Sequence, residues 1–577
     1  MRFNLAGALL LPLVLHAINY SALSKDKYWR ILGHYKNGVS EIDSKNFFLA
    51  KNGKYSPENE LKATINRLIK PKFKNDRSVY CRFPARREWI KSKLPGLKIP
   101  KQNCKELNEE LSAIKNIKSV TLVFPTILMN SPASMFGHTL LRLDDANGDK
   151  LNSFAVNYAA QTNETNGLIY AIKGLTGGYV GKYAIVPYYK KIAEYNDIKN
   201  RDIWEYTLNL NPKEIYRLKL HLMEIKNTWS YYYYFNKNCS YQILWLLEAA
   251  RPNLKIVYEF NYKVLPVDTI KEAYIEKLIS NSVFRPSKQK TILNYFNNIK
   301  NKKIALLFEQ THNYSLIQAL DTEEKKYILD FAIEMLNYKY LSKKISKKEY
   351  LKHYISLLKK RSRLGKEKPL KINTPQNPLY SHDSNKIWIY GAKGKITAGI
   401  KPAFHFTDDM NTGFTPGAYI DFFKMEIEFN KNLRLNNFYF FNIKSLTPRN
   451  EIFKPVSWSV DLGIRRFKKD KLYAYLNTGA FFTYRIKNLL YSFGLKIPQY
   501  LKKNYYITAS PDFYGEYNFQ KAKFSLEISR CFFDFKTYNE VNAEFIYKIK
   551  RNFNINAGYR KNINENFFYG GLSLYFL

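Results

Sequence analysis

One histidine and one cysteine stand in local settings that suit thiol chemistry. His138 closes the segment Ser-Pro-Ala-Ser-Met-Phe-Gly-His before an alternating apolar run that begins at Leu140. Cys239 lies in Asn-Lys-Asn-Cys-Ser before an apolar run that begins at Ile243. These patterns predict a histidine on a strand and a cysteine at the start of a helix. A thiol nucleophile and its base need such rigid supports.

The predicted chemistry is attack by a thiolate. A helix N-terminus and a nearby imidazolium both favour the charged sulfur, so each lowers the pKa of the cysteine. Asn236 or Asn238 can cap the helix, and we place Asn238 and Ser240 at the cap and the oxyanion site. His138 would take the thiol proton and return it to the leaving group. The alternative is structural: a lone cysteine is often a small buried hydrophobe.

Several motifs, at residues 81–86, 131–139, 156–160, 177–181, 201–206 and 238–240, resemble those of one family. This family is the Lnb N-terminal periplasmic domain family, and the similarity covers roughly residues 30–290. The resemblance implies a circularly permuted papain-like fold, as in lecithin:retinol acyltransferase-like proteins, with histidine before cysteine. The family's namesake is a lipoprotein intramolecular transacylase, which implies acyl or peptide chemistry through a thioester.

A third polar residue often orients the histidine of such a pair. Asn157 is our candidate because it lies on the next predicted strand, and Ser134 is a weaker one. The glycine-rich segment near Gly178 lacks the spacing and the Ser or Thr of a phosphate loop, so we expect a tight turn near the substrate cleft. Tyr234 belongs to four consecutive tyrosines that would wall an acyl-chain pocket or pack beneath the cysteine helix. We therefore assign Ser134, Gly178 and Tyr234 to the cleft.

The N-terminus predicts export. Residues 1–24 combine Arg2, a short apolar stretch and a cleavage site before Lys25, which is typical of a signal peptide. In an oxidising compartment, Cys81 and Cys104 are expected to form a disulfide across a short proline-containing loop. Cys239 then stays free, and Cys531, in a strand pattern, is expected to be a bystander.

The composition points to an envelope protein. The formal net charge is +43, and aromatic residues make up 16% of the chain, including 47 Tyr and 39 Phe. Export argues against nucleic acid as the partner. The lysines either cover solvated faces or contact anionic lipid headgroups, and the aromatic excess suits a membrane interface. We predict no cofactor and no metal site.

The period of the apolar pattern changes from helical to alternating near residue 375. Before it, Asn211, Pro212 and Glu214 predict a cleanly capped helix, and residues 267–365 are expected to be helical. After it, aromatic-rich alternating segments continue to Leu577, which predicts roughly 8–12 strands of an outer-membrane barrel. A soluble barrel or sandwich is the alternative.

We thus expect a multidomain chain: an α+β permuted papain-like thiol domain with helical extensions, followed by an antiparallel transmembrane β-barrel. The expected parts are a signal peptide (1–24), a helical region (25–115), the thiol domain (116–290), helices with a basic linker (291–375) and the barrel (376–577).

The predicted function is a periplasm-facing, cysteine-dependent acyltransferase or hydrolase tethered to the outer membrane. The expected partners are outer-membrane lipids, a lipoprotein or phospholipid acyl donor, and the barrel-assembly machinery. The alternative is a non-catalytic barrel or scaffold with a periplasmic interaction domain, and the motif contexts of His138 and Cys239 argue against it.

Overall fold

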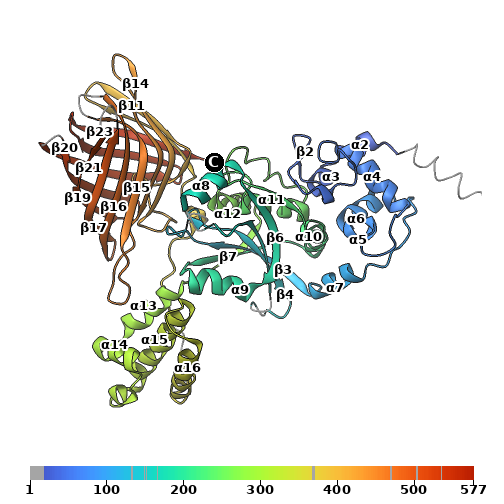
Figure 1. Cartoon of the computed structure of the whole chain (residues 1–577), viewed down its shortest axis with the longest axis horizontal. Helices are drawn as coiled ribbons and strands as arrows, with labels where there is room; N and C mark the ends of the chain where they lie inside the picture. The colour runs from blue at the N-terminus through green and yellow to red at the C-terminus, as the bar shows by residue number, and fades with distance from the viewer. Residues whose placement is uncertain are drawn as a thin grey trace, which may run out of the picture. The chain divides into compact units, whose positions relative to one another are not determined.

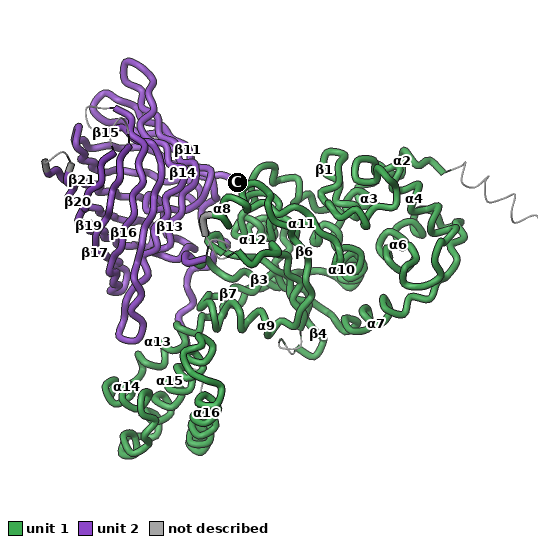
Figure 2. Tube along the Cα trace, viewed as in Figure 1, with its two compact units in different colours: residues 1–128, 132–370 green, residues 129–131, 371–577 purple. Residues whose placement is uncertain are grey.

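The computed structural model describes residues 18–131, 134–148, 150, 153–164, 167–366, 371–467, 471–501, 505–533 and 536–577. Most of the predicted signal peptide lies outside the described residues. The chain divides into two compact units, residues 1–128 with 132–370 and residues 129–131 with 371–577 (Figure 2). None of the described helices has both the length and the apolar composition to cross a bilayer. Figure 1 labels the elements in chain order.

The first part of unit 1 consists of short helices around a buried ion pair. Arg86 Nη1 lies 2.8 Å from Glu60 Oε1, and both side chains are 1% exposed. The backbone N–H of Arg86 donates to Glu224, which ties these helices to the next layer. Cys81 and Cys104 form the expected disulfide. The elements are α2 (Tyr20–Ser24), α3 (Lys27–Leu32), β1 (Tyr35–Lys36), β2 (Val39–Ser40), η1 (Lys45–Phe47), α4 (Pro57–Ile69), α5 (Val79–Arg82), α6 (Pro84–Lys93) and α7 (Lys105–Ala113).

The centre of unit 1 is an antiparallel seven-stranded sheet in the order β8-β6-β5-β4-β3-β7-β9. Its inner strands are apolar and buried because helices cover them. The strands are β3 (Ile117–Pro125), β4 (Leu140–Asp145), β5 (Phe154–Gln161), β6 (Tyr179–Pro187), β7 (Ile203–Leu208), β8 (Trp229–Tyr232) and β9 (Ile279–Arg285).

The helices of this layer begin where the sequence places their caps. Asn211 and Glu214 form the predicted capping box on α10. The prediction of helix throughout 267–365 is wrong at β9, an edge strand whose short, mostly exposed run carries little alternation. The helices are α8 (Gly167–Thr176), α9 (Tyr188–Ile192), the π-helix η3 (Ala193–Ile198), α10 (Pro212–Ile225), α11 (Cys239–Ala250) and α12 (Pro266–Ile275).

A helical group follows β9. Ser346 caps its last helix by accepting a hydrogen bond from the N–H of Glu349. The aromatic rings of Phe296 and Phe331 pack 5.3 Å apart at its centre. The predicted basic linker begins in the last turn of this helix and continues beyond it. Residues 367–370 lie outside the described part of the chain. The helices are α13 (Lys288–Asn298), α14 (Lys302–Thr311), η4 (Tyr314–Ile317), α15 (Thr322–Leu341) and α16 (Lys347–Ser362).

Unit 2 is a closed antiparallel barrel, as the alternating pattern predicts. Twelve strands of the described chain form the ring, which closes where β11 pairs with β13. They are β10 (Asn385–Ala392), β11 (Lys395–Lys401), β13 (Ala418–Phe429), β14 (Leu433–Ser445), β15 (Ser457–Phe467), β16 (Lys471–Ile486), β17 (Leu489–Leu501), β19 (Ser510–Asn518), β20 (Ala522–Phe533), β21 (Lys536–Lys550), β22 (Phe553–Lys561) and β23 (Asn566–Phe576). The short η5 (Pro378–Tyr380), β12 (Ala403–His405) and β18 (Tyr505–Ile507) supplement the ring.

The barrel is polar inside and apolar outside. On β10, Lys386, Trp388 and Tyr390 are buried, whereas Ile387 and Ile389 are 40% and 49% exposed. The same alternation recurs around the ring, with outward apolar residues that include Phe493, Leu495, Ile497, Phe524, Ile528, Phe532, Phe545, Ile555, Leu572 and Leu574. A soluble protein has the opposite arrangement, with its apolar residues inside.

Residues 406–417, here called the lumen loop, enter the barrel between β12 and β13. Asp409 accepts hydrogen bonds from Lys386 on β10 and from Tyr575 on β23. Asn411 donates to Glu516 on β19. Since β10 and β19 lie far apart around the ring, the loop crosses the interior. A polar cavity of about 290 Å³, lined partly by Phe406 and Asp408, remains beside it.

Candidate active site of the thiol domain

Cys239 is the first residue of α11, and Asn238 caps the helix. The side-chain oxygen of Asn238 accepts from the N–H groups of Ser240 (3.0 Å) and Tyr241 (3.2 Å). Its amide nitrogen donates to the carbonyls of Tyr234 and Val264, each at 2.7 Å. Asn238 is therefore committed to the cap, and neither its amide nor the N–H of Ser240 is left for an oxyanion. The capping role predicted for Asn238 is thus confirmed, whereas these bonds leave the predicted oxyanion role without a donor from either group.

His138 lies two residues before β4 rather than on the strand itself. Its backbone N–H donates to the carbonyl of Pro125 at 3.2 Å. Gly137 has a φ of +93°, and a Cβ there would lie 2.7 Å from the ring of Phe124, so the turn needs glycine. Thr139 then donates to the hydroxyl of Ser240 at 3.0 Å. The entry to β4 is thereby linked to the entry to α11.

Asn157 on β5 holds the histidine ring, in the place that the sequence suggested. Its side-chain oxygen lies 2.6 Å from Nε2 of His138, and both residues are buried. An amide oxygen only accepts, so Nε2 must carry the proton. In the neutral ring the lone pair then stays on Nδ1, which is the nitrogen that can accept the proton of Cys239.

The surroundings of Cys239 favour its thiolate. Burial raises the pKa of the thiol and is the largest single effect, but the charge and hydrogen bond of His138, together with smaller contributions from Thr139 and Ser240, lower the pKa to about 7. The backbone N–H of Thr139 and the hydroxyl of Ser240 add to this effect. Sγ lies 3.8 Å from Oγ of Ser240. Ser240 thus acts on the sulfur through its side chain.

Arg201 supports the site from behind and was not singled out from the sequence as a site residue. Its guanidinium donates to the carbonyls of Thr126 (2.6 Å) and Pro125 (2.7 Å) and to the hydroxyl of Ser134 (3.3 Å). It lies 5.1 Å from the ring centre of Tyr195, which packs against the ring of His138. Burial lowers the pKa of Arg201 to about 10, so it stays charged at neutral pH and favours a nearby anion.

Tyr232 on β8 is a second site residue that sequence reasoning did not identify. It is buried, and its hydroxyl accepts a hydrogen bond from the backbone N–H of Cys239. Burial raises the pKa of Tyr232 well above its ordinary value, so the phenol keeps its proton. Because the N–H of Cys239 is bonded to this hydroxyl, the O–H of Tyr232 is the donor that remains beside the sulfur. The run of four tyrosines was a signal for this residue, but it did not say which ring faces the thiol.

The three predicted cleft residues have different roles. The hydroxyl of Ser134 accepts from Arg201, and its carbonyl accepts from the N–H groups of Leu128 and Gly137, so it shapes the turn before His138. Tyr234 packs against α8, because a Cβ on Gly174 would lie 2.5 Å from its ring. The N–H of Gly178 ends α8 by donating to the carbonyl of Lys173 at 2.7 Å.

His221 lies apart from this site. It is fully buried on α10, and its Nε2 lies 3.0 Å from Nε2 of His34. The sequence favoured a position on the helix face over a second catalytic base, and the observed contact fits that interpretation. Cys531 belongs to the barrel and lies on β20.

We expect alkylation of Cys239 to follow the ionisation of a thiol with a pKa of about 7. Replacing His138 with Gln removes the two largest lowering effects and leaves burial, so the pKa should rise above the ordinary value of about 8.5. Iodoacetamide labelling against pH in a Cys531→Ser background measures this. His353→Gln, which alters a distant helix, should not move the curve. Identical curves for His138→Gln and the parent protein would contradict the pair.

Four family models match successive segments of the chain. Residues 108–275 match the family model described as the Lnb N-terminal periplasmic domain. Three domains of unknown function match residues 21–93, 282–372 and 375–575. A search of curated proteins found no match.

Among solved structures, the barrel is similar to two porins. A KdgM porin in complex with disordered oligogalacturonate is 11% identical, with 33% of this chain and 99% of that chain covered and a TM-score of 0.22. A NanC porin is 12% identical, with 33% and 100% covered and a TM-score of 0.23. The barrel itself rests on its own strand pairing. Residues 108–275 thus resemble the Lnb N-terminal periplasmic domain, and twelve strands of the described chain form an antiparallel barrel later in the sequence.

Proposed function

We propose that the chain is a cysteine-dependent acyltransferase or hydrolase that the barrel tethers to the outer membrane. Cys239 is the nucleophile, His138 is its base and Asn157 orients the base. The observation that carries the proposal is the lowered pKa of a buried thiol, to about 7, caused by a histidine that Asn157 holds in one tautomer. A structural cysteine in an apolar setting has its pKa raised instead.

The reaction runs in two steps. Nδ1 of His138 takes the thiol proton as Sγ of Cys239 attacks the carbonyl carbon of an ester or amide. The tetrahedral oxyanion accepts a hydrogen bond from the O–H of Tyr232. Collapse breaks the bond to the leaving group, which takes the proton from His138 and leaves an acyl thioester. Water or an amine acceptor then gives a proton to His138, attacks the thioester and restores the thiol.

Arg201 is a positioning residue in this scheme. It touches no reacting atom, but it fixes the turn that presents His138 through Pro125 and Ser134. Its buried charge also stabilises a thiolate relative to a thiol. A papain-like thiol domain with these roles remains our interpretation of the Lnb N-terminal periplasmic domain.

The barrel is proposed to span the outer membrane. Its outward apolar residues would meet lipid, and its buried polar residues would line the interior, as in outer-membrane barrels. Closure of the ring satisfies the backbone groups that lipid cannot. The expected partners are then outer-membrane lipids, the barrel-assembly machinery, and a lipoprotein or phospholipid acyl donor for the thiol domain.

The test of the enzyme uses the full chain in detergent with vesicles of phosphatidylethanolamine and a diacylated lipopeptide. We expect fatty-acid release or transfer, detected by mass spectrometry. Cys239→Ala should lower the rate by roughly 10³-fold or more, as loss of a nucleophile does in related chemistry. Cys531→Ala is the matched control and should keep the rate. Equal rates for Cys239→Ala and the parent protein would leave the non-catalytic scaffold as the function.

The membrane proposal predicts a position-dependent cost of charge. Leu495→Arg puts a charge on the outward face of β17 and should reduce the folded barrel, since such a charge near the bilayer centre costs about 2–4 kcal/mol. Asn488→Arg adds the same charge at the exposed turn before β17 and should be tolerated. Heat-modifiable gel migration of outer-membrane fractions measures the folded share. Equal folding of both variants, or recovery of the protein in the soluble fraction, would refute the tether.

A further inference from the structure

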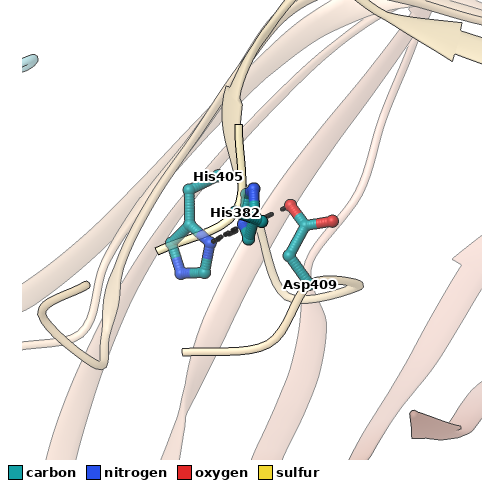
Figure 3. Close-up of side chains that lie close together, drawn as sticks. All are labelled: His382, His405 and Asp409. Atoms are coloured by element: carbon teal, nitrogen blue, oxygen red, sulfur yellow. Dashed lines mark hydrogen bonds and ion pairs between the residues drawn. The ribbon is translucent and has the colours of Figure 1, made fainter. Parts of the chain in front are cut away.

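Two histidines and an aspartate meet inside the barrel, apart from the thiol site (Figure 3). His382 precedes β10, His405 ends β12, and Asp409 belongs to the lumen loop. All three are buried, with exposures of 3%, 0% and 0%. One ligand atom from each lies within 4.8 Å of the other two. Nε2 of His382 and Nδ1 of His405 are 3.1 Å apart.

The hydrogen bonds fix where the protons of the two rings lie. Nδ1 of His382 lies 2.7 Å from the carbonyl of Asp383, which can only accept, so this nitrogen carries a proton. Nε2 of His405 lies 3.1 Å from the side-chain oxygen of Asn411. That amide cannot be turned around, because its nitrogen donates to Glu516 and Asn518. Nε2 of His405 therefore carries a proton as well.

Two neutral rings with these protons direct lone pairs at each other. The facing atoms are Nε2 of His382 and Nδ1 of His405, and Oδ2 of Asp409 lies 3.9 Å from the latter. Two facing lone pairs and a carboxylate need a cation. The cation is either one extra proton on the rings or a metal ion.

A second buried histidine pair makes the contrast clear. His34 and His221 also approach to 3.0 Å, through Nε2 of each. Nδ1 of His34 has no hydrogen-bond partner among the described residues, so His34 can carry its proton on Nε2 and donate to His221, whose Nδ1 faces Glu224 at 3.6 Å. The pair at His382 and His405 has lost that freedom, because acceptors occupy both outer nitrogens.

The spacing of the two imidazole nitrogens suits a metal ion, and Oδ2 of Asp409, 3.9 Å from Nδ1 of His405, would have to move about half an ångström closer to complete a tetrahedral set. With bonds of about 2.0–2.1 Å, two nitrogens 3.1 Å apart enclose an angle of about 100° at the ion, close to tetrahedral. Two histidines and one aspartate form a common set for Zn²⁺, with a fourth position for water. The backbone carbonyl of Asp383 and the amide of Asn411 then orient the two imidazoles, as outer partners of metal ligands usually do.

The neighbouring charges can adjust to an ion. Asp409 is bound by Lys386 and by Lys401, which would have to give up Oδ2. Lys401 also lies 3.4 Å from Asp421, a fully buried carboxylate whose two oxygens have no hydrogen-bond partner among the described residues. Lys401 can thus shift to Asp421 when an ion takes Asp409.

We propose that His382, His405 and Asp409 bind one divalent transition-metal ion of the Zn²⁺ class. The ion joins the segment before β10 to both the end of β12 and the lumen loop, so it fixes the loop inside the barrel. This site is independent of the chemistry of Cys239.

The test uses the full chain in detergent, stripped with a chelator and dialysed against ZnCl₂ or CoCl₂. We expect one bound equivalent by elemental analysis and, with Co²⁺, an X-ray absorption spectrum with two imidazole ligands. His405→Gln and His382→Gln should lower the affinity by at least roughly 10-fold, as loss of a ligand does. His353→Gln is the matched control and should bind as the parent does.

Heat-modifiable migration checks that each variant still folds. If a variant does not fold, the cobalt spectrum of the parent protein decides, because it reports the ligands directly. Less than one equivalent bound by the folded parent, or a cobalt spectrum without histidine, would overturn the proposal. In that case a shared proton links the two rings.

Discussion

The hydrogen bond between Asn157 and His138 is the constraint on which the thiol site depends. It holds the proton on Nε2 and leaves Nδ1 for the sulfur. Without it, the ring could present an N–H to Cys239, and the effects that lower the pKa of the thiol would weaken. The sheet supplies this constraint, since Asn157 lies on β5, which pairs with the strand that follows His138.

Other residues hold the elements around that hydrogen bond in place. The side chain of Asn238 binds the first N–H groups of α11 and the carbonyls of Tyr234 and Val264, which keeps Cys239 at the helix end. Arg201 binds the turn before His138. Tyr232 takes the N–H of Cys239 and brings a hydroxyl to the sulfur. A polar residue thus fixes each element that carries a reacting group.

The barrel follows a different rule. Its stability in lipid would come from closure, and its interior must satisfy buried charges within the protein. Lys386, Lys401 and Asp409 do so near the entry of the lumen loop. At the His382–His405 pair, two facing ring nitrogens need a cation as well.

Local signals in the sequence predicted local features. The cap at Asn211, the helix that begins at Cys239 and the alternation through Lys386 to Tyr390 each depend on a few neighbouring residues. The antiparallel barrel followed from repeated alternation. Asn157 could be predicted because the strand that carries it is the next one in the sequence after the strand that follows His138.

Features that depend on distant contacts could not be predicted in this way. Strand β9 is an exposed edge whose pairing with β7 supplies what its own pattern lacks. Most arginines lie at the surface, so the residue type of Arg201 gives no sign that it is buried beside the site. The lumen loop and the meeting of His382 with His405 depend on closure of the ring. No spacing along the chain encodes these contacts.

The central claim is that Cys239 carries the acyl group. The most direct measurement is the mass of the full chain, and of its Cys239 peptide, after brief incubation with the lipopeptide vesicles. The account predicts one acyl group on Cys239 that neutral hydroxylamine removes, as it does a thioester, and none on a Cys239→Ala variant. Turnover with no adduct on Cys239, or an adduct on another residue that forms equally in Cys239→Ala, would contradict it.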